Sequence, residues 1–412
     1  MIPQLRRATL AVGLAAALGG LVGAAVPASS AEAGTRAGTR AGTAEGTVLY
    51  ANAPDAVPGR YVVVLKEAAV TATVDGLARQ YGGTVDFTYT AALQGFAVRA
   101  DARAARRLAA DPRVAYVAQD QKVGLAVSVQ PNPPSWGLDR IDERSLPLDL
   151  KYHYPNTAGR VKAYIIDTGI RFTHQEFGGR AVPGVDTIGD GQNGNDCHGH
   201  GTHVAGTVGG RSVGVAKQVR LVAVRVLNCA GSGTYAQVIA GVDWVTQDAQ
   251  LSRTLGVANM SLGGGFYQPL NDAVTASIDA NVHYSVAAGN SNADACTASP
   301  ASTPRATTLG ATDITDTRAA FSNHGTCVDV FGPGVNIYSA TATSDSSYAS
   351  FSGTSMASPH AAGTAALWRM RFPADDADTV AGAIAANATP GVVVNPGVGS
   401  PNLLLFMGMI PV

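Results

Sequence analysis

Three short segments that lie far apart in the chain each carry one residue of a catalytic type. They are Ile165–Gly169, His200–Gly206 and Gly353–His360, and they contain Asp167, His200 and Ser355 in that order. A serine hydroxyl is a weak nucleophile at neutral pH, so it needs an imidazole to accept its proton and a carboxylate to hold that imidazole. Other folds build the same triad in the orders His-Asp-Ser and Ser-Asp-His, so the order here restricts the folds that this chain can adopt.

From residue 135 to residue 412, predicted strands alternate with predicted helices. The expected strands cover 161–167, 221–227, 257–261, 282–288 and 307–310; the expected helices begin at His200, cover 235–249 and 271–280, and follow Ser355. This alternation is typical of an α/β fold with a mostly parallel sheet and helices on both faces. In such sheets the active site lies at the carboxyl ends of the strands, where Asp167, Ser261 and Asn290 fall.

Residues 58–123 follow a different pattern, which predicts a small ferredoxin-like α+β domain. Strands are expected at 61–65, 84–90, 95–100 and 114–118, with helices at 74–81 and 101–110. Residues 34–46 contain the repeat Gly-Thr-Arg-Ala and almost no apolar bulk, so we expect a disordered linker, which we extend over residues 34–57. Residues 124–134, rich in Gln, Val, Ser and Pro, are expected to form a cleavable connection to the domain at 135–412.

Residues 1–33 have the layout of a secretory signal peptide, because Arg6 and Arg7 precede an apolar run and small residues follow it. A membrane anchor is the alternative, but glycines interrupt the run. The formal net charge is −1, and no basic run carries interleaved aromatic residues, so nucleic acid is not an expected partner. We therefore expect a secreted, extracellular protein without membrane attachment once the signal is removed.

Ser355 precedes a run of small residues that predicts a buried helix, which places its hydroxyl beside the free N–H groups of a helix N-terminus. Pro359 has no N–H to bond to the Ser355 carbonyl, so we expect an irregular first turn. Asn290 follows Ala288 and Gly289 at a strand end and can donate its amide to a developing oxyanion. The alternatives are that Ser355 is only an N-cap and that Asn290 only forms a turn.

A zinc site is an alternative for the region around His200. The eight residues from 196 to 203 contain four possible zinc ligands: Asp196, His198, His200 and His203. The cluster lacks the His-Glu-x-x-His pattern that supplies two ligands and a base. It would also leave the segment around Ser355 without a role.

The three segments, together with Val286–Asn290, resemble the motifs of the subtilisin-like serine peptidases, most closely those of the secreted proteinase K and aqualysin branch. The resemblance covers nearly the whole chain. It implies a serine endopeptidase that acts through an acyl-enzyme, with Asp167, His200 and Ser355 as the triad and Asn290 in the oxyanion hole. It also implies broad specificity, because substrate is bound mainly through main chain, at Gly231, Ser232, Gly233, Ser261, Leu262, Gly263, Ala288 and Gly289.

In position and pattern, residues 58–123 resemble the inhibitory propeptide of the same family, with a permanent accessory domain as the alternative. The resemblance implies a self-processing zymogen, a monomer that acts on polypeptides and is inhibited by its own propeptide. An inactive binding module and an α/β-hydrolase are competing hypotheses. No catalytic residue is missing, however, and Gly353–Ala357 lacks the second glycine of Gly-x-Ser-x-Gly.

All four cysteines lie within residues 135–412, and an even count in an exported protein predicts two disulfides in one of three pairings. The resemblance implies the pairs Cys197–Cys229 and Cys296–Cys327. Each bridge would close a loop of about 32 residues and stabilise the fold by about 3 to 4 kcal/mol.

The resemblance also implies structural calcium and no organic cofactor. One site would use Asp329 with the carbonyl groups of Pro304 and Ala306. A second would use Asp139 and Asp142, together with Glu143 and Asp149. Lys151 departs from the family pattern at this second site, because it stands where an oxygen ligand is expected.

Overall fold

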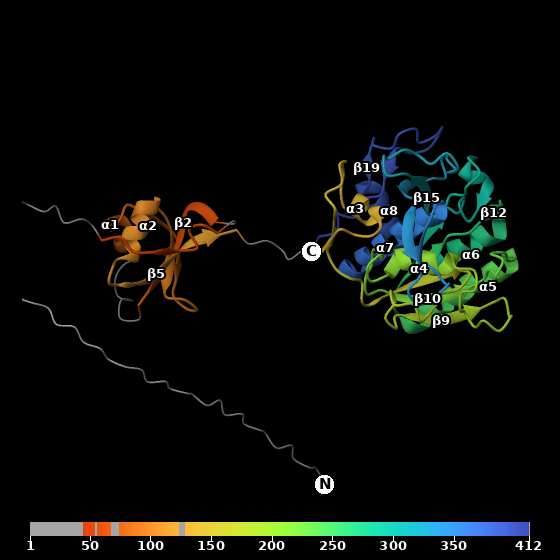
Figure 1. The fold of residues 1–412 in the computed structure, drawn as a ribbon, viewed down its shortest axis with the longest axis horizontal. Helices are drawn as coiled ribbons and strands as arrows, with labels where there is room; N and C mark the ends of the chain where they lie inside the picture. Colours follow the sequence, from red (N-terminus) through yellow and green to blue (C-terminus); the bar gives the residue numbers. More distant parts are fainter. Residues whose placement is uncertain (1–43, 54–55, 67–73, 123–127, 412) are drawn as a thin grey trace, which may run out of the picture. The chain divides into compact units, whose positions relative to one another are not determined.

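The computed structural model describes residues 44–53, 56–66, 74–122 and 128–411. They form two compact units (Figure 1). Unit 1 precedes the division between Val123 and Gly124, and unit 2 follows it. The expected signal peptide, residues 1–33, lies outside the described residues, as do residues 34–43 of the expected linker. Within the described ranges, no helix has both the length and the apolar character needed to cross a bilayer.

Unit 1 is a five-stranded sheet with two helices packed on it. Its elements are β1 (Val48–Leu49), β2 (Ala56–Leu65), α1 (Val74–Gln80), β3 (Thr84–Tyr89), β4 (Gly95–Arg99), α2 (Ala102–Ala109) and β5 (Val114–Gln121). The strand order is β1-β5-β2-β4-β3, and only β1 with β5 is a parallel pair. Leu77 of α1 and Leu108 of α2 are buried against Val63 and Phe96 of the sheet. The elements from β2 onward have the predicted ferredoxin-like order.

Residues 44–53, which we expected to belong to a disordered linker, are ordered against unit 1. β1 pairs with β5, the Gly46 N–H donates to the Arg106 carbonyl at 2.7 Å, and Glu45 forms an ion pair with the Arg106 guanidinium at 2.7 Å. The prediction of a linker over 34–57 therefore does not hold for these residues, nor for residues 56 and 57 of β2. Val48 and Leu49 pair with Val117 and Ala118 of β5, and Val48 packs against the apolar cluster of unit 1.

Unit 2 is built on a nine-stranded sheet with the order β19-β20-β16-β15-β13-β11-β8-β10-β9 (Figure 1). The strands are β8 (Val161–Asp167), β9 (Ala181–Asp186), β10 (Arg220–Arg225), β11 (Leu255–Met260), β13 (Val282–Ala287), β15 (Thr307–Thr312), β16 (Val330–Pro333), β19 (Thr389–Pro390) and β20 (Leu403–Leu404). Neighbouring strands are parallel except for β19 with β20. The predicted mostly parallel sheet is confirmed.

Helices cover both faces of this sheet. They are α3 (Trp136–Ile141), α4 (His200–Gly209), α5 (Tyr235–Ser252), α6 (Gln268–Asp279), α7 (Thr354–Arg371) and α8 (Ala377–Asn387), with a 3-10 turn at Ala295–Thr297. Alternate residues of β8 enter two apolar clusters, Ile165 with residues of α4 and α7, and Ile166 with residues of α5 and α6. Asp167 shares the face of Ile165, so β8 ends on the side where α4 begins at His200.

Three short antiparallel pairs complete unit 2: β6 (Ser128–Pro131) with β7 (Lys151–Tyr154), β12 (Gly264–Gly265) with β14 (Ala298–Ser299), and β17 (Ile337–Ala340) with β18 (Tyr348–Phe351). β6 lies inside the expected connection at 124–134. Its Gln130 side chain donates to the Ser212 carbonyl at 2.8 Å and accepts from the Lys217 ammonium. Part of the expected connection is therefore a strand of unit 2, held by partners too distant in sequence to be inferred locally.

Candidate active site

Asp167 and His200 are joined by a hydrogen bond at the carboxyl end of β8. His200 Nδ1 lies 2.8 Å from Asp167 Oδ1, and because a carboxylate can only accept, Nδ1 carries the proton and Nε2 is left to accept another. Asp167 is fully buried. The glycine at 201 permits this approach of α4 to β8, because a Cβ there would clash with the Gly169 carbonyl oxygen.

The surroundings of His200 favour its protonated form. Burial of the ring lowers its pKa, but the charge and hydrogen bond of Asp167, with a contribution from the charge of Asp196, outweigh burial, so the pKa of His200 is raised. The pair is suited to proton transfer, because the carboxylate stabilises the imidazolium that forms.

Ser355 lies in the first turn of α7, where its hydroxyl donates to the Ser261 carbonyl at 3.1 Å. Ser355 lines one hollow with His200, His198 and Asn290. The structure thus brings the predicted nucleophile and the predicted base to one site, while the Ser355 hydroxyl is bonded to the Ser261 carbonyl rather than to the imidazole.

The first turn of α7 is helical, so the prediction of an irregular turn at Pro359 is wrong. Pro359 leaves the Ser355 carbonyl without its helical donor, and the Ser261 hydroxyl donates to that carbonyl at 2.7 Å instead. The Asn259 side-chain amide in turn donates to Ser261 Oγ at 2.9 Å. Groups at the end of β11 therefore replace the missing N–H.

Asn290 follows β13, and its side-chain oxygen is occupied. Asn290 Oδ1 accepts from the Thr354 N–H at 2.8 Å and from the Thr354 hydroxyl at 2.9 Å. These bonds fix the amide orientation and leave the Nδ2 hydrogens for another acceptor in the hollow that Asn290 shares with Ser355. An oxyanion-binding donor needs this arrangement.

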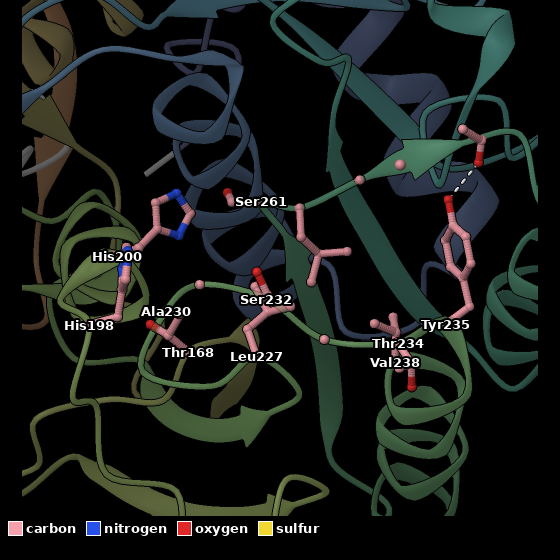
Figure 2. Close-up of a pocket in the computed structure, with 16 residues that line it drawn as sticks. Thr168, His198, His200, Leu227, Ala230, Ser232, Thr234, Tyr235, Val238 and Ser261 are labelled. Atoms are coloured by element: carbon pink, nitrogen blue, oxygen red, sulfur yellow. Dashed lines mark hydrogen bonds between the residues drawn. The ribbon is translucent and has the colours of Figure 1, made fainter.

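Adjoining hollows form one groove in unit 2. The largest, about 610 Å³, has His200 and Ser261 at one end and Tyr235 at the other (Figure 2). A second, about 470 Å³, shares Leu262–Gly265 with the first and extends to Ser355. Every residue that we predicted to bind substrate lines one or both of these hollows: Gly231, Ser232, Gly233, Ser261, Leu262, Gly263, Ala288 and Gly289.

Tyr235 is a groove residue that the sequence patterns did not single out. Its hydroxyl donates to the Gly265 carbonyl at 2.5 Å (Figure 2), and its ring stacks on that of Tyr267 with centroids 4.4 Å apart. The sequence shows an aromatic residue just after Gly231–Gly233, but it does not show the stacking partner, which comes from the N-cap of α6.

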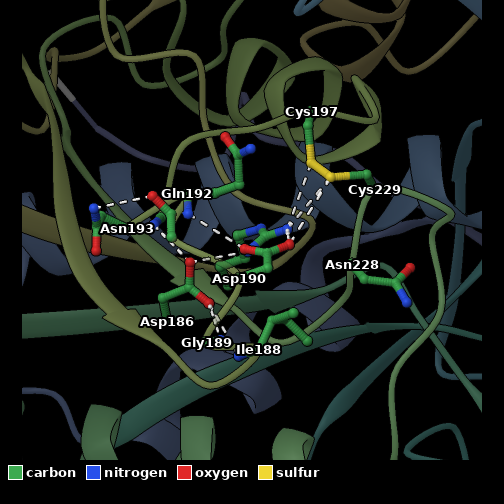
Figure 3. A network of polar contacts seen from close by, with 12 residues as sticks. Asp186, Ile188, Gly189, Asp190, Gln192, Asn193, Cys197, Asn228 and Cys229 are labelled. Carbon is green, nitrogen blue, oxygen red and sulfur yellow. Dashed lines mark hydrogen bonds and ion pairs between the residues drawn. A yellow bond between two sulfur atoms is a disulfide. The ribbon is translucent and has the colours of Figure 1, made fainter.

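Both predicted disulfides, Cys197–Cys229 and Cys296–Cys327, are present. The first joins the turn before His200 to the loop before Gly231 (Figure 3). The buried Arg225 guanidinium lies 3.4 Å from one of its sulfur atoms and forms ion pairs with Asp186 and Asp190 at 3.0 and 2.5 Å. This network connects the turn that carries the imidazole to the wall of the groove.

The side-chain contacts do not support the zinc alternative. The His203 ring stacks on Phe351 with centroids 4.3 Å apart, and its Nε2 donates to the Ile337 carbonyl at 3.0 Å. Burial lowers the pKa of His203 to about 4, so this ring stays neutral and packed. Both Asp196 oxygens accept backbone hydrogen bonds. In the part of the chain that the structure describes, carboxylates with metal-ligand spacing gather elsewhere.

Asp139, Glu143 and Asp149 present carboxylate oxygens that all lie within 4.8 Å of one another. Asp139 is buried, its Oδ1 has no hydrogen-bond partner, and burial raises its pKa. Oxygen ligands at this spacing fit Ca²⁺, which would neutralise the buried charge. Lys151 pairs with Asp149 at 3.1 Å, so its ammonium group competes for one of the three carboxylates.

The other predicted calcium ligands have partners of their own. Asp142 Oδ2 accepts from the N–H and the ring Nδ1 of His153 at 2.6 and 3.0 Å, and burial raises the pKa of Asp142 to about 7. Asp329 accepts from the Thr308 N–H at 2.8 Å, and burial raises its pKa to about 6. Thr308 closely follows the two predicted carbonyl ligands, Pro304 and Ala306.

Comparison with known proteins identifies two regions. The model of the Subtilase family matches residues 153–404, and the model of Peptidase inhibitor I9 matches residues 60–126. An extracellular serine proteinase of Thermus sp. (strain Rt41A) is 50% identical over 381 residues, which cover 87% of this chain and 92% of that protein. Alkaline serine exoprotease A of Vibrio alginolyticus is 44% identical over 372 residues, covering 86% and 68% respectively.

A solved structure, titled as the crystal structure of a cold adapted subtilisin-like serine proteinase, superposes with a TM-score of 0.63 and 49% identity. The match covers 66% of this chain and 97% of that one.

Proposed function

This chain belongs to the subtilase family of serine proteinases, and we propose that it is a secreted, self-processing endopeptidase with Asp167, His200 and Ser355 as its triad. One observation carries the proposal: the 2.8 Å hydrogen bond between Asp167 and His200 stands at a hollow that Ser355 and Asn290 also line. Ionised aspartate, neutral imidazole and free hydroxyl are the three groups that nucleophilic acyl transfer requires.

In the proposed reaction, the Ser355 hydroxyl turns from the Ser261 carbonyl toward Nε2 of His200 and attacks the scissile carbonyl carbon. His200 accepts the serine proton while Asp167 stabilises the imidazolium. The Nδ2 group of Asn290 donates to the oxyanion of the tetrahedral intermediate. His200 then protonates the leaving amine as the peptide C–N bond breaks. A water molecule, deprotonated by the same imidazole, attacks the acyl carbon, the bond from that carbon to Ser355 Oγ breaks, and His200 returns the proton to Oγ.

The groove supports recognition of an extended peptide through its main chain. Gly231–Gly233 and Ser261–Gly263 offer backbone groups along the groove, and Ala288 and Gly289 add no bulky side chain to the wall of one hollow. Backbone pairing tolerates many substrate sequences, so we expect broad specificity with a preference for aromatic or aliphatic residues before the cleaved bond.

The inhibitor-type domain at residues 60–126 supports synthesis as a zymogen. We infer that it occupies the groove until cleavage between about Gly124 and Pro131, and that the mature monomer acts outside the cell. The name of the Thermus relative, an extracellular serine proteinase, and the two disulfides favour export. Calcium at Asp139, Glu143 and Asp149, and at Asp329, would stabilise unit 2 without entering the reaction.

The test uses the full chain and its Ser355→Ala variant. The parent protein should convert to a shorter form and react with a fluorophosphonate probe at Ser355, and the variant should remain an unprocessed, unlabelled precursor. Thr364→Ala, which removes a buried hydroxyl farther along α7, is the matched control and should still process. Efficient self-cleavage by Ser355→Ala would refute the triad. A parent protein that is folded but neither processed nor labelled would favour the inactive binding module.

A further inference from the structure

Asp196 is a buried carboxylate to which the proposed reaction assigns no role; its residue is 3% exposed. Its Oδ1 accepts from the Thr168 hydroxyl at 2.9 Å and from the N–H groups of His198 and Gly199 at 2.9 and 2.8 Å. Its Oδ2 accepts from the N–H and the hydroxyl of Thr202 at 2.9 and 2.6 Å. Five donors therefore converge on a single side chain.

These donors come from both sides of the Asp167–His200 pair. Thr168 directly follows Asp167, and its own N–H donates to Asp167 Oδ1 at 2.8 Å. The other donors belong to the turn that surrounds His200, and the Gly201 N–H closes the connection by donating to the Thr168 hydroxyl at 2.9 Å. The distance between the Asp167 carboxylate and the His200 imidazole thus depends on a second carboxylate, that of Asp196, which is hydrogen-bonded to neither of them.

We propose that Asp196 is a positioning residue for the acyl-transfer reaction: its carboxylate holds His200 against Asp167, and its charge supports the imidazolium that forms during the reaction. The proposal rests on the triad proposed above. This role goes beyond helix capping: Asp196 accepts the N–H of Thr202 in the first turn of α4, but three of its five donors, the Thr168 hydroxyl and the N–H groups of His198 and Gly199, lie outside that helix, whose N-cap is Gly199 at a φ of +106°.

The energetic argument concerns charge. Burying a carboxylate is costly unless its oxygens are hydrogen-bonded, and the five donors meet that requirement. Among the described residues, Asp196 forms no ion pair. No salt bridge therefore neutralises its negative charge, which can stabilise the imidazolium form of the nearby His200. Burial lowers the pKa of His200, Asp167 and Asp196 together raise it by more, and the charge of Asp196 gives the smaller part of that rise.

Other ionisable groups also face His200. The His198 ring lies with its centroid 6.4 Å from that of His200, and a charge on His200 lowers the pKa of His203. Catalysis needs neutral His200, so a raised pKa places the acid limb of the activity profile at higher pH. Removing the charge of Asp196 should therefore move that limb to lower pH.

The experiment compares the full-chain protein with Asp196→Asn and Asp186→Asn. The asparagine at 196 keeps Oδ1 as an acceptor but has no charge and cannot accept from Thr202 through Nδ2. Because a small misplacement of reacting groups can cost about 10²-fold, we expect kcat/KM to fall by about 10- to 100-fold, mostly in kcat, with the acid limb shifted to lower pH.

Asp186→Asn is the matched control, because Asp186 also accepts backbone hydrogen bonds, from Ile188 and Gly194, but accepts none from the residues around His200 and is connected to that turn through Arg225. It should alter thermal stability without moving the acid limb. An Asp196→Asn protein with parental kcat and parental acid limb would overturn the inference, while fluorophosphonate labelling of the parent would show that the triad itself stands.

If Asp196→Asn does not fold, a second variant tests the positioning role of Asp196. Thr168→Val keeps the charge of Asp196 but removes the hydroxyl that joins it to the Asp167 side and to Gly201. We expect a lower kcat, an almost unchanged KM and an unshifted acid limb. A parental kcat in Thr168→Val would contradict the positioning role.

Discussion

The Ser261 hydroxyl replaces the N–H that Pro359 lacks as donor to the Ser355 carbonyl, which predicts a measurable energetic coupling between positions 261 and 359. Ser261→Ala removes the donor to the Ser355 carbonyl and the acceptor of the Asn259 amide. A buried polar group left without a partner costs about 1 to 3 kcal/mol, so the loss of both partnerships should lower the free energy of unfolding by about 2 to 4 kcal/mol.

In a Pro359→Ala background, the new N–H at position 359 can donate to the Ser355 carbonyl as in a regular helix. Ser261→Ala should then cost only the Asn259 contribution, which gives a coupling energy of about 1 to 3 kcal/mol between positions 261 and 359. The four proteins are prepared with Ser355→Ala to prevent autolysis, and this change leaves the carbonyl in place.

Guanidinium unfolding followed by tryptophan fluorescence suits this cycle, because Trp136, Trp244 and Trp368 all belong to unit 2. The signal therefore reports the unfolding of unit 2 alone. Coupling below about 0.5 kcal/mol, within the range of independent sites, would show that Ser261 does not replace the proline's missing donor.

Two further predictions concern turnover and metal. Asn290→Ala should lower kcat by about 10²- to 10³-fold with little change in KM, a range known from an oxyanion-hole donor in this same family; an unchanged kcat in steady-state kinetics would remove Asn290 from the oxyanion hole. Chelation of calcium should lower the melting temperature of the mature enzyme, and Asp139→Asn should reduce that response, because Asp139 contributes a buried oxygen without a partner. A melting temperature that is insensitive to both chelator and added calcium would count against either site.

Much of the fold could be predicted from local patterns. Buried strands read as short apolar runs, so the predicted boundaries of β8 agree with the structure, and the ferredoxin-like order of unit 1 follows from its alternating residues. The predictions that failed, a linker over the residues of β1 and a connection over the residues of β6, failed for the same reason. β1 and β6 are only two and four residues long, too short for a periodic pattern, and they are held by pairing with strands far away in sequence, which no local pattern records.

The candidate site, like the fold, could be predicted from the sequence only in part. Residue identities and chain order determined the chemistry: an aspartate at a strand end, a histidine at a helix start and a serine before a small-residue helix admit few catalytic arrangements, because nucleophilic acyl transfer needs those three groups. Only the tertiary structure decided that the Ser355 hydroxyl is bonded to Ser261, that the Pro359 turn stays helical, and that Asp196 joins both sides of the pair. These features are hydrogen bonds between residues far apart in sequence, and their geometry exists only after the sheet and its helices have packed together.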